Sequence, residues 1–394
     1  MSHDPVVIAG YARTPMGGFQ GALAPAKATE LGSAAVKAAV ERSGVDPALI
    51  ERIYMGCVLP AGLGQAPARQ AALGAGLPLS VEATTLNKMC GSGMQAVIMA
   101  AEALSARAID VVVAGGMESM SNAPYLLQKH RAGARIGHDR VIDHMMMDGL
   151  EDAYDAGKPM GAFAEDTARA FQFTREEQDA YALKSLENAL HAVRSGAFEG
   201  EITPVEVKGR SGVTRIDTDE QPAAARPEKI PQLKPAFAKD GTITAASSAS
   251  ISDGAAALVL VRESTAKAQG LPIIAYLRGA AAHAHEPGLF TTAPVPAIQK
   301  ALKAAGWTAD AVDLFEINEA FAVVPMIAMR ELGLPRDKVN VNGGATALGH
   351  PIGASGARII TTLIAALAAR GGKRGIASLC IGGGEATAVA VELA

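Results

Sequence analysis

The sequence predicts an α/β protein in which one fold occurs twice, with a loop domain inserted into the first copy. Apolar segments of strand length alternate with helical patterns over residues 6–116, and the same order returns over residues 273–384. Strands that alternate with helices imply a mostly parallel sheet covered by helices on both faces. Three glycine pairs mark equivalent positions at intervals of about 265 residues, far longer than the period of a solenoid: Gly44 and Gly306, Gly93 and Gly356, Gly116 and Gly383.

The first copy starts with an apolar strand at residues 6–9 and a helix over about residues 29–43. Apolar residues at three- and four-residue spacing define that helix, and Gly44 is placed to end it. Further strands are expected at residues 53–56 and 111–116. The second of these is continuously apolar, which is typical of a strand buried on both faces.

The second copy repeats this order in the last third of the chain. The expected strands lie at residues 273–275, 312–316 and 377–381, and the expected helices at residues 297–305 and 353–369. The duplication therefore predicts an N-terminal half of residues 1–271 and a C-terminal half of residues 272–394.

Residues 121–247 have no counterpart in the second copy, and they are more polar and richer in loops. One helix is clear in this insert, from Thr174, which forms a capping box with Glu177, to about Ser195. We expect the insert to lie over the carboxyl ends of the strands, where open α/β sheets bind ligands. A docking loop for oligomerisation, with a basic stretch at residues 129–140, is the alternative. The expected buried stripe of the helix comprises Ala180, Leu183, Leu186, Leu190 and Val193.

The composition argues against several classes of protein. The net charge is −4 and no block of lysine or arginine indicates a nucleic-acid surface. No apolar run approaches the ~18 residues of a membrane span, and the first residues resemble neither a secretory signal nor a transit peptide. We therefore expect a cytoplasmic protein. The three cysteines, Cys57, Cys90 and Cys380, form no CxxC pair, so neither a metal site nor a disulfide framework is predicted.

Cys90 is the first candidate for chemistry. The strand-like residues 84–86 precede it, and a helical pattern opens at Met94, so the thiol is expected where a strand meets a helix. The unpaired N–H groups and the dipole of a helix N-terminus stabilise a thiolate there. Glycines in this turn would let a substrate approach the backbone closely. The alternative is a small, buried, inert cysteine, which is the commoner fate of a free cysteine.

Three further segments place polar residues at equivalent ends of predicted elements. Asn318 follows a strand, His350 ends a glycine-rich loop at a helix entrance, and Cys380 leaves a strand just before Gly382. Two pseudo-symmetric halves would bring these residues to a shared midline. A thiol, an imidazole, a second thiol and N–H donors suit acyl transfer. Each residue singly has a structural alternative, as a cap or a turn.

Two other classes of protein are alternatives to acyl transfer. The Cys-Gly-Ser-Gly segment at residues 90–93 contains a GxG, but the full GxGxxG of a dinucleotide-binding dehydrogenase is missing. A non-catalytic acyl-CoA or lipid carrier could use the same fold, because fold does not fix function. The presence of all the catalytic residue types argues against the carrier.

Several long motifs resemble those of the thiolases. The resemblance runs from about residue 5 to residue 394 with small gaps, and it also includes residues 115–124, Pro159-Met-Gly161 and residues 253–256. It implies two pseudo-symmetric mixed sheets layered with helices in the order αβαβα. The motifs that carry it are Asn87-Lys-Met-Cys-Gly-Ser-Gly93, Asn318-Glu-Ala-Phe321, Gly343-Gly-Ala-Thr-Ala-Leu-Gly-His-Pro-Ile-Gly-Ala-Ser-Gly356 and Cys380-Ile-Gly-Gly-Gly384.

The resemblance also implies a role for each candidate residue. Thiolases join or split 3-ketoacyl-CoA thioesters, with Cys90 here as the acylated nucleophile and His350 as the acceptor of its proton. Asn318 would position a water beside the thioester oxygen that His350 helps to hold. Cys380 would take the α-proton of the second acetyl-CoA. The backbone N–H groups of Cys90 and Gly382 would form the other oxyanion hole.

The resemblance also indicates residues of the substrate site. Met160, Phe237 and Phe321 stand where the family shapes the acyl and pantetheine site, and Ser250 is a candidate contact to CoA. The chain departs from the common pattern at Pro159, Ala249 and Pro222, and Arg226 lies near the last of these. The resemblance implies condensation of two acetyl-CoA into acetoacetyl-CoA, with a broader-chain 3-ketoacyl-CoA thiolase of fatty-acid degradation as the alternative. It implies CoA thioesters as substrates, no resident cofactor, and a homotetramer built as a dimer of dimers.

Overall fold

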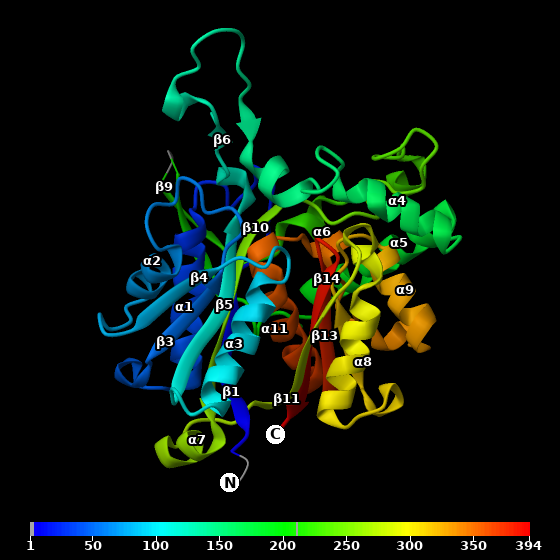
Figure 1. The fold of residues 1–394 in the computed structure, drawn as a ribbon. Helices are drawn as coiled ribbons and strands as arrows, with labels where there is room; N and C mark the ends of the chain where they lie inside the picture. Colours follow the sequence, from blue (N-terminus) through cyan, green and yellow to red (C-terminus); the bar gives the residue numbers. More distant parts are fainter. Residues whose placement is uncertain (1–3, 210–211) are drawn as a thin grey trace.

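The structure, a computed structural model, describes residues 4–209 and 212–394. Its centre is a mixed sheet with strands from both halves of the chain, and helices pack on both of its faces (Figure 1). In spatial order the strands are β12 (Leu314–Ile317), β13 (Arg374–Ile381), β14 (Glu385–Leu393), β11 (Ala275–Ala284), β1 (Val6–Arg13), β10 (Ser252–Arg262), β5 (Val111–Ser119), β3 (Arg52–Gly56) and β4 (Glu82–Leu86), and β2 (Gly17–Gly18) pairs with β10.

Two half-sheets, one from each copy, meet at a short ladder. Strand β1 pairs with β11 only through Val7 with Tyr276 and Ile8 with Ala275, so the two predicted sheets are joined edge to edge. The expectation of a mostly parallel sheet is wrong. Strands β3, β4 and β5 pair in parallel, as do β12 and β13, but β10 and β14 run antiparallel to every main neighbour. A tight turn joins β13 to β14, and such a turn permits only antiparallel pairing.

Helices form three layers around the two half-sheets. Helices α1 (Ala28–Ser43) and α2 (Pro67–Gly74) cover the outer face of the first half-sheet. Helices α3 (Ser92–Ser105) and α11 (Ile352–Arg370) pack on each other between the half-sheets, and α8 (Pro294–Ala305) and α9 (Val323–Leu332) cover the far side (Figure 1). The αβαβα order implied by the resemblance is therefore confirmed.

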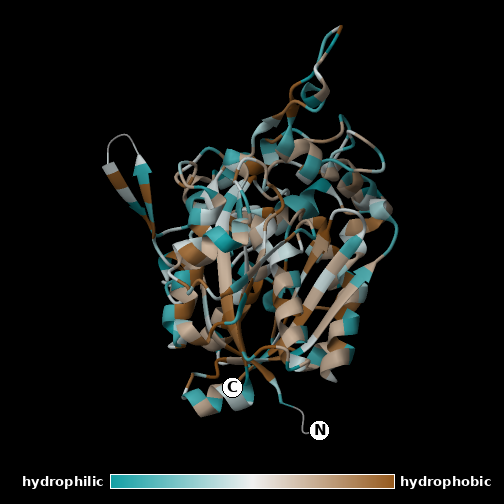
Figure 2. Ribbon diagram, turned by 60° about the vertical axis from the view of Figure 1, so that its left-hand side comes forward, coloured by the Kyte–Doolittle hydropathy of each residue, from teal (hydrophilic) through white to brown (hydrophobic). Residues whose placement is uncertain are grey.

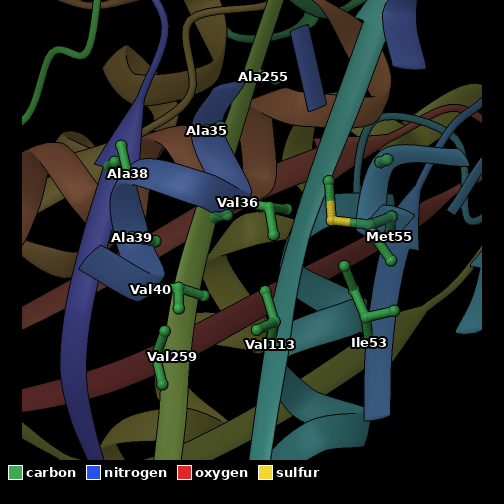
Figure 3. Packing of buried hydrophobic residues seen from close by; sticks show 14 of the residues in the cluster. Ala35, Val36, Ala38, Ala39, Val40, Ile53, Met55, Val113, Ala255 and Val259 are labelled. Carbon is green, nitrogen blue, oxygen red and sulfur yellow. The ribbon is translucent and has the colours of Figure 1, made fainter. Parts of the chain in front are cut away.

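Apolar side chains from helix and sheet fill the space between these layers. Figure 3 shows Val36 and Val40 of α1 directed at Val113 of β5 and Val259 of β10. Hydrophobic residues concentrate on the strands and the inner helices, and hydrophilic ones on the outer surfaces and loops (Figure 2). Helix α11 is long and apolar enough to cross a membrane by length and composition alone. However, 89% of the 18-residue apolar stretch that meets this test is buried inside the protein. Its apolarity therefore fits its place at the centre of the core.

Most of the predicted elements are present, but one strand is displaced. Gly44 and Gly306 end their helices with φ of 65° and 70°, as expected for left-handed caps. The strand expected at residues 273–275 starts only at Ala275 and continues to Ala284. Its sequence consists largely of alanine, glycine and polar residues, so it shows no run of large apolar residues.

The insert lies above the carboxyl ends of the parallel strands, as expected (Figure 1). It includes a protruding hairpin of β6 (Tyr125–Leu126) and β7 (Ile142–Asp143), and helices α4 (Met160–Ala170), α5 (Arg175–Arg194) and α6 (Glu220–Ala224). A second hairpin, β8 (Val205–Gly209) with β9 (Gly212–Ile216), projects from the side of the body (Figure 2). Short helices α7 (Glu263–Gln269) and α10 (Ala345–Leu348) complete the chain.

Thr174 caps α5 with the predicted capping box, but the predicted buried stripe of this helix is partly wrong. Ala180 is exposed, and the buried face includes Gln178, Tyr181 and Ser185. These polar side chains are buried because they bond to other parts of the fold, Gln178 to Thr242 and the other two to a carboxylate described below. Hydrophobic periodicity cannot identify a face that is buried through hydrogen bonds.

Candidate active site

Cys90 lies in the turn between β4 and α3, one residue before the N-cap Gly91. The side chain is half-buried, and the backbone N–H groups of Gly382 and of Cys90 itself lie close enough to its thiol to lower the pKa. Met89 adopts a φ of 46°, a left-handed conformation that is unusual for a bulky residue. Hydrogen bonds from Met89 N–H to Asn87 Oδ1 at 2.9 Å and from Ser92 Oγ to the Met89 carbonyl at 2.6 Å hold this turn. The cysteine therefore stands at the predicted helix entrance.

His350 lies in the loop between α10 and α11, and its hydrogen bonds define its tautomer. Its backbone N–H bonds to the Ser250 carbonyl at 3.1 Å and to Ser252 Oγ at 3.2 Å. Its Nδ1 lies 2.6 Å from Ser355 Oγ, and that hydroxyl donates its proton to the Pro351 carbonyl at 3.0 Å. Because the Ser355 hydroxyl donates its proton to Pro351, it can only accept a hydrogen bond from His350. Nδ1 is therefore the donor in that bond, and Nε2 carries the free lone pair. The imidazole is therefore arranged to accept a proton at Nε2.

Asn318 follows β12 and reaches the same imidazole. Its backbone N–H bonds to the Ser378 carbonyl at 2.9 Å, which extends the β12–β13 pairing by one residue. Its Nδ2 lies 3.5 Å from His350 Nε2, and its buried Oδ1 accepts no hydrogen bond within the described parts of the chain. The asparagine therefore presents a donor and an acceptor beside the histidine lone pair.

Cys380 and Gly382 complete the set from the other half of the chain. Cys380 is a buried residue near the end of β13, and its thiol lies close enough to Cys90 for a thiolate there to raise the pKa of Cys380. The turn to β14 needs φ values of 94° at Gly383 and 85° at Gly384, which glycine adopts without strain. Ile352, at the start of α11, packs in the same apolar cluster as Cys90. The structure thus brings the four predicted catalytic residues to the junction of the two halves.

Burial keeps the reactive groups uncharged in the free protein. It raises the pKa of the Cys90 thiol to about 11, against the lowering effect of the Gly382 and Cys90 N–H groups. Burial also raises the pKa of Cys380 and lowers the pKa of His350 to about 3, with the Arg358 charge lowering it further. The expected thiolate at the helix N-terminus is therefore not present at rest, because desolvation outweighs the donors. The cysteine must lose its proton when the substrate reacts.

The predicted acyl-site residues also gather here. Met160 begins α4, and its sulfur lies where a Cβ on Gly382 would meet it at 3.4 Å. The Phe321 ring packs edge-on against Phe237, with ring centroids 5.8 Å apart. Gly161 leaves room for the Phe237 ring, because a Cβ there would lie 2.4 Å from it. An apolar wall therefore stands beside Cys380 and Gly382.

Ser250 lies at the edge of a neighbouring cavity of about 350 Å³. Arg226 and Lys229 line this cavity together with Leu233 and Thr346, so it combines two cations with apolar surface. Ser248 is turned away and donates to the Thr244 carbonyl at 2.8 Å. Of the two serines that flank Ala249, only Ser250 lines this cavity, and its carbonyl also holds the His350 loop.

Sequence reasoning assigned no role to two buried carboxylates that support this site. Glu118, at the end of β5, accepts N–H groups from Val58 at 2.9 Å, Leu59 at 3.1 Å and Gly353 at 2.9 Å. Burial raises its pKa to about 7. Glu118 therefore ties the start of α11 to the first half-sheet. In the sequence, Glu118 is marked only by its place in the motif of residues 115–124. Ser355 also lies in a motif, and the sequence patterns assign it no role.

Glu319 is the second buried carboxylate. It accepts hydrogen bonds from Tyr181 Oη at 2.9 Å, Ser185 Oγ at 2.7 Å, Asn340 Nδ2 at 2.8 Å, and Thr346 N and Oγ1 at 3.1 and 2.7 Å. Tyr181 and Ser185 belong to the insert, whereas Asn340 and Thr346 precede the His350 loop. Glu319 therefore joins α5 to the segment that carries Asn318 and His350.

Comparison with known proteins agrees with this geometry. The family described as Thiolase, N-terminal domain matches residues 6–264, and Thiolase, C-terminal domain matches residues 271–393. The chain therefore belongs to the thiolase family. It is 53% identical over 392 residues to acetyl-CoA acetyltransferase 2 of Arabidopsis thaliana, covering 98% of this chain and 97% of that protein. It is 47% identical over 386 residues to an acetyl-CoA acetyltransferase of Pseudomonas aeruginosa, covering 98% of each chain.

Solved structures agree with the fold over the whole chain. The acetyl-CoA acetyltransferase of Bacillus anthracis superposes with a TM-score of 0.96 at 41% identity, covering 100% of this chain and 99% of that one. The Acat5 thiolase of Ascaris suum, solved in complex with coenzyme A, superposes with a TM-score of 0.94 at 42% identity, covering 99% and 100% of the two chains.

Proposed function

We propose that the protein is an acetyl-CoA C-acetyltransferase, which joins two acetyl-CoA into acetoacetyl-CoA and free CoA through an acyl-cysteine, and which also catalyses the reverse reaction. The observation that carries the proposal is the meeting of Cys90 and Cys380 with a histidine whose Nε2 is free to accept a proton. The names of full-length relatives at 47% and 53% identity support the choice of substrate.

In the first half-reaction the Cys90 sulfur attacks the thioester carbonyl of acetyl-CoA. Its proton passes to His350 Nε2, and the oxygen becomes negative as the new C–S bond forms. The N–H groups of Cys90 and Gly382 would stabilise that oxyanion. The tetrahedral intermediate collapses by breaking the bond to the CoA sulfur, which takes the proton from His350 and leaves as the free thiol. The product is an acetyl group on Cys90.

In the second half-reaction Cys380 passes its own proton to His350 Nε2, and the resulting thiolate removes an α-proton from a second acetyl-CoA. The electron pair of that C–H bond forms an enolate, whose oxygen would be held by the protonated Nε2 of His350 and by a water on Asn318. The enolate carbon attacks the acetyl-Cys90 carbonyl, and the C–S bond to Cys90 breaks to release acetoacetyl-CoA. The Cys90 thiolate takes the proton from His350, and Cys380 keeps the α-proton as its thiol proton. Because a thioester α-proton is weakly acidic, both the base and the oxyanion donors are needed.

The substrate is itself the activated acyl group, so we propose that no resident cofactor takes part. The cavity beside Ser250 is our candidate for the nucleotide end of CoA, since Arg226 and Lys229 offer charge to its phosphates. The pantetheine arm would then pass Ser250 toward Met160 and Phe321. The acyl end would meet Met89 and the wall formed by Phe237 and Phe321.

The direct test is intact mass spectrometry after a brief exposure to acetyl-CoA. One acetyl group is expected, and it should map to Cys90. Cys380→Ser should still become acetylated but should lose condensation and the exchange of the α-proton. Acetylation that persists in Cys90→Ala, or full condensation by Cys380→Ser, would contradict these roles.

The alternative is a 3-ketoacyl-CoA thiolase of broader chain length in fatty-acid degradation, which the proline at position 159 favours. One extra methylene is worth only about 1–3 kcal/mol in an apolar pocket, so discrimination should be graded. We expect thiolysis kcat/KM to fall steadily from four- to six- and eight-carbon ketoacyl-CoA substrates. If the eight-carbon substrate equals or exceeds acetoacetyl-CoA, the broader thiolase replaces the present proposal.

We further propose that the enzyme is a cytoplasmic homotetramer. The segment around β6 and β7 supports assembly, because it exposes Tyr125, Ile136 and Val141 at 67%, 96% and 64% beside the basic stretch of residues 129–140. Exposed apolar side chains on a protruding hairpin are typical of an interface. Light scattering at micromolar concentration should give the mass of four chains, and cell fractionation should find the protein in the cytoplasm.

A further inference from the structure

Two turns, one from each half of the chain, supply the N–H donors around Cys90. The first is the nucleophile turn, residues 87–91, between β4 and α3, and it carries the Cys90 N–H. The second is the glycine turn, residues 382–384, between β13 and β14, and it carries the Gly382 N–H. An oxyanion is stabilised only when both donors lie about 2.7–3.1 Å from it. The relative position of the two turns must therefore be held to a few tenths of an ångström.

Each turn is fixed within its own half. In the nucleophile turn, Lys88 N–H bonds to Ser92 Oγ at 2.8 Å, which adds to the bonds around Met89. In the glycine turn, the Gly384 carbonyl accepts the His285 N–H at 2.9 Å. These contacts shape each turn but do not connect one turn with the other.

Besides the Gly382 N–H that faces the Cys90 thiol, two contacts cross from one turn to the residues beside the other. Lys88 Nζ forms an ion pair with Glu385, the first residue of β14, and their side chains are only 25% and 35% exposed. Ile381 packs on Gly91 so closely that a Cβ at position 91 would lie 2.3 Å from Ile381 Cδ1. The packing limits how near the turns can come, and the ion pair opposes their separation.

We propose that the Lys88–Glu385 ion pair is a positioning device that holds the Cys90 and Gly382 donors in register across the two halves. This rests on the proposed function, since the register matters only if an oxyanion forms there. Neither side chain needs to touch the reacting atoms. Lys88 stands two residues before the nucleophile, and Glu385 stands three residues after Gly382. A displacement of either residue therefore also displaces the turn that contains or adjoins it.

The test compares Glu385→Gln and Lys88→Met with the unaltered enzyme. The rate constant for acetyl transfer to Cys90 should fall about tenfold or more, because misplaced oxyanion donors act on the transition state. The KM for acetyl-CoA should stay within about twofold, because ground-state binding is untouched. The combined reversal, Lys88→Glu with Glu385→Lys, should recover most of the lost rate. Glu82→Gln is the matched control, since Glu82 pairs with Arg52 on the surface of β3 and β4 and should leave the rate unchanged.

Salt provides a second readout that needs no variant. At about 1 M ionic strength the Debye length falls to about 3 Å, which weakens a partly exposed ion pair. The rate constant of the unaltered enzyme for acetyl transfer to Cys90 should then fall, and an unchanged rate constant would contradict the positioning role. This series decides the matter even if a variant fails to fold.

The outcomes separate this proposal from the proposed function. An unaltered enzyme that does not acetylate Cys90 contradicts the function itself. An active enzyme whose folded Glu385→Gln and Lys88→Met variants keep its rate within about twofold contradicts only the positioning role. A rise in KM without a change in the rate constant would also overturn it, since that pattern belongs to substrate binding.

Discussion

At the scale of single residues, the site combines groups that are neutral at rest with donors that are already in place. Burial disfavours the charged forms of both Cys90 and His350. The thiol has a pKa of about 11 and the imidazole has a pKa of about 3. In the proposed reaction, the Cys90 proton therefore passes to His350 only when a thioester oxygen is present to take up the negative charge. Such a site avoids keeping a free thiolate exposed to oxidants.

The first prediction concerns the reactivity of Cys90 in the absence of substrate. Alkylation by iodoacetamide follows the thiolate, and with a pKa of about 11 only about one thiol in a thousand is ionised at pH 8. The rate should rise about tenfold per pH unit from pH 7 to 10, which mass spectrometry of the labelled peptide can follow. Cys90→Ala should show little labelling near neutral pH, because burial also raises the pKa of Cys57 and of Cys380. A plateau below pH 9 would mean that the thiolate is stabilised in the free enzyme.

The second prediction concerns the tautomer of His350. Ser355→Ala removes the hydroxyl that accepts from Nδ1, so the proton is free to move to Nε2 and block the base. We expect kcat to fall about tenfold or more while KM changes little. Ser43→Ala is the control, since Ser43 is also buried and also donates to a backbone carbonyl, that of Val40 at 2.7 Å, but in another part of the fold. An unchanged kcat in Ser355→Ala would show that the tautomer is set in another way.

At the scale of elements, buried hydrogen bonds act together with apolar contacts to fix the insert on the site. Helix α5 buries Tyr181 and Ser185 against Glu319, which also holds Asn340 and Thr346. A buried carboxylate with this many donors is costly to lose, because each donor is then left unsatisfied. Glu319 therefore organises both the insert and the loop that leads to His350.

The third prediction tests this carboxylate. Glu319→Ala should destabilise the protein by about 3 kcal/mol or more, because several buried donors lose their acceptor. Thermal unfolding and native-state hydrogen exchange should both detect the change, with α5 the most affected element. Glu187→Gln, on the exposed side of the same helix, should leave the melting temperature unchanged, since Lys184 is the only hydrogen-bond partner of Glu187 among the residues that the structure describes. Normal protection of α5 in Glu319→Ala would contradict the assigned role.

At the scale of the whole molecule, glycines allow the two halves to pack through their central helices. A Cβ on Gly356 of α11 would lie 2.3 Å from the Met94 nitrogen of α3, and one on Gly93 would lie 2.8 Å from the Ala357 nitrogen. We expected glycines near Cys90 to admit substrate, but Gly91 and Gly93 instead admit the opposite half of the protein. Since α3 begins at the nucleophile and α11 at the histidine loop, this contact sets how far apart they are.

The fourth prediction follows from that contact. Gly356→Ala should force α3 and α11 apart and destabilise the protein by about 1–3 kcal/mol. The acetylation rate of Cys90 should fall as well, because the helix entrances separate. Gly200→Ala is the control, since nothing lies within 4 Å of a Cβ at that position and its φ is not positive. Equal melting temperatures for the two variants would mean that the helices adjust without cost.

Local pattern was sufficient to predict many of the elements and the site residues from sequence. Strand-length apolar runs, helical spacing and glycine caps identified α1, α3, α8 and α11 within one to three residues, because those signals act over a few neighbouring positions. The motifs placed Cys90, Asn318, His350 and Cys380 at the ends of these elements. The antiparallel pairing of β10 with β5 and of β14 with β13 was not predicted, because such pairing depends on the path of the chain and not on strand composition.

Other properties were decided only by tertiary structure. The buried face of α5 depends on Glu319, which lies more than a hundred residues away, and the joined sheet depends on two residue pairs between β1 and β11. The neutral state of Cys90 reverses the expectation drawn from its helix terminus, because the packing of both halves removes water from the thiol. The sequence thus determined which side chains are present and on which elements they lie. Their partners, burial and charge arise only when segments far apart in the chain come into contact.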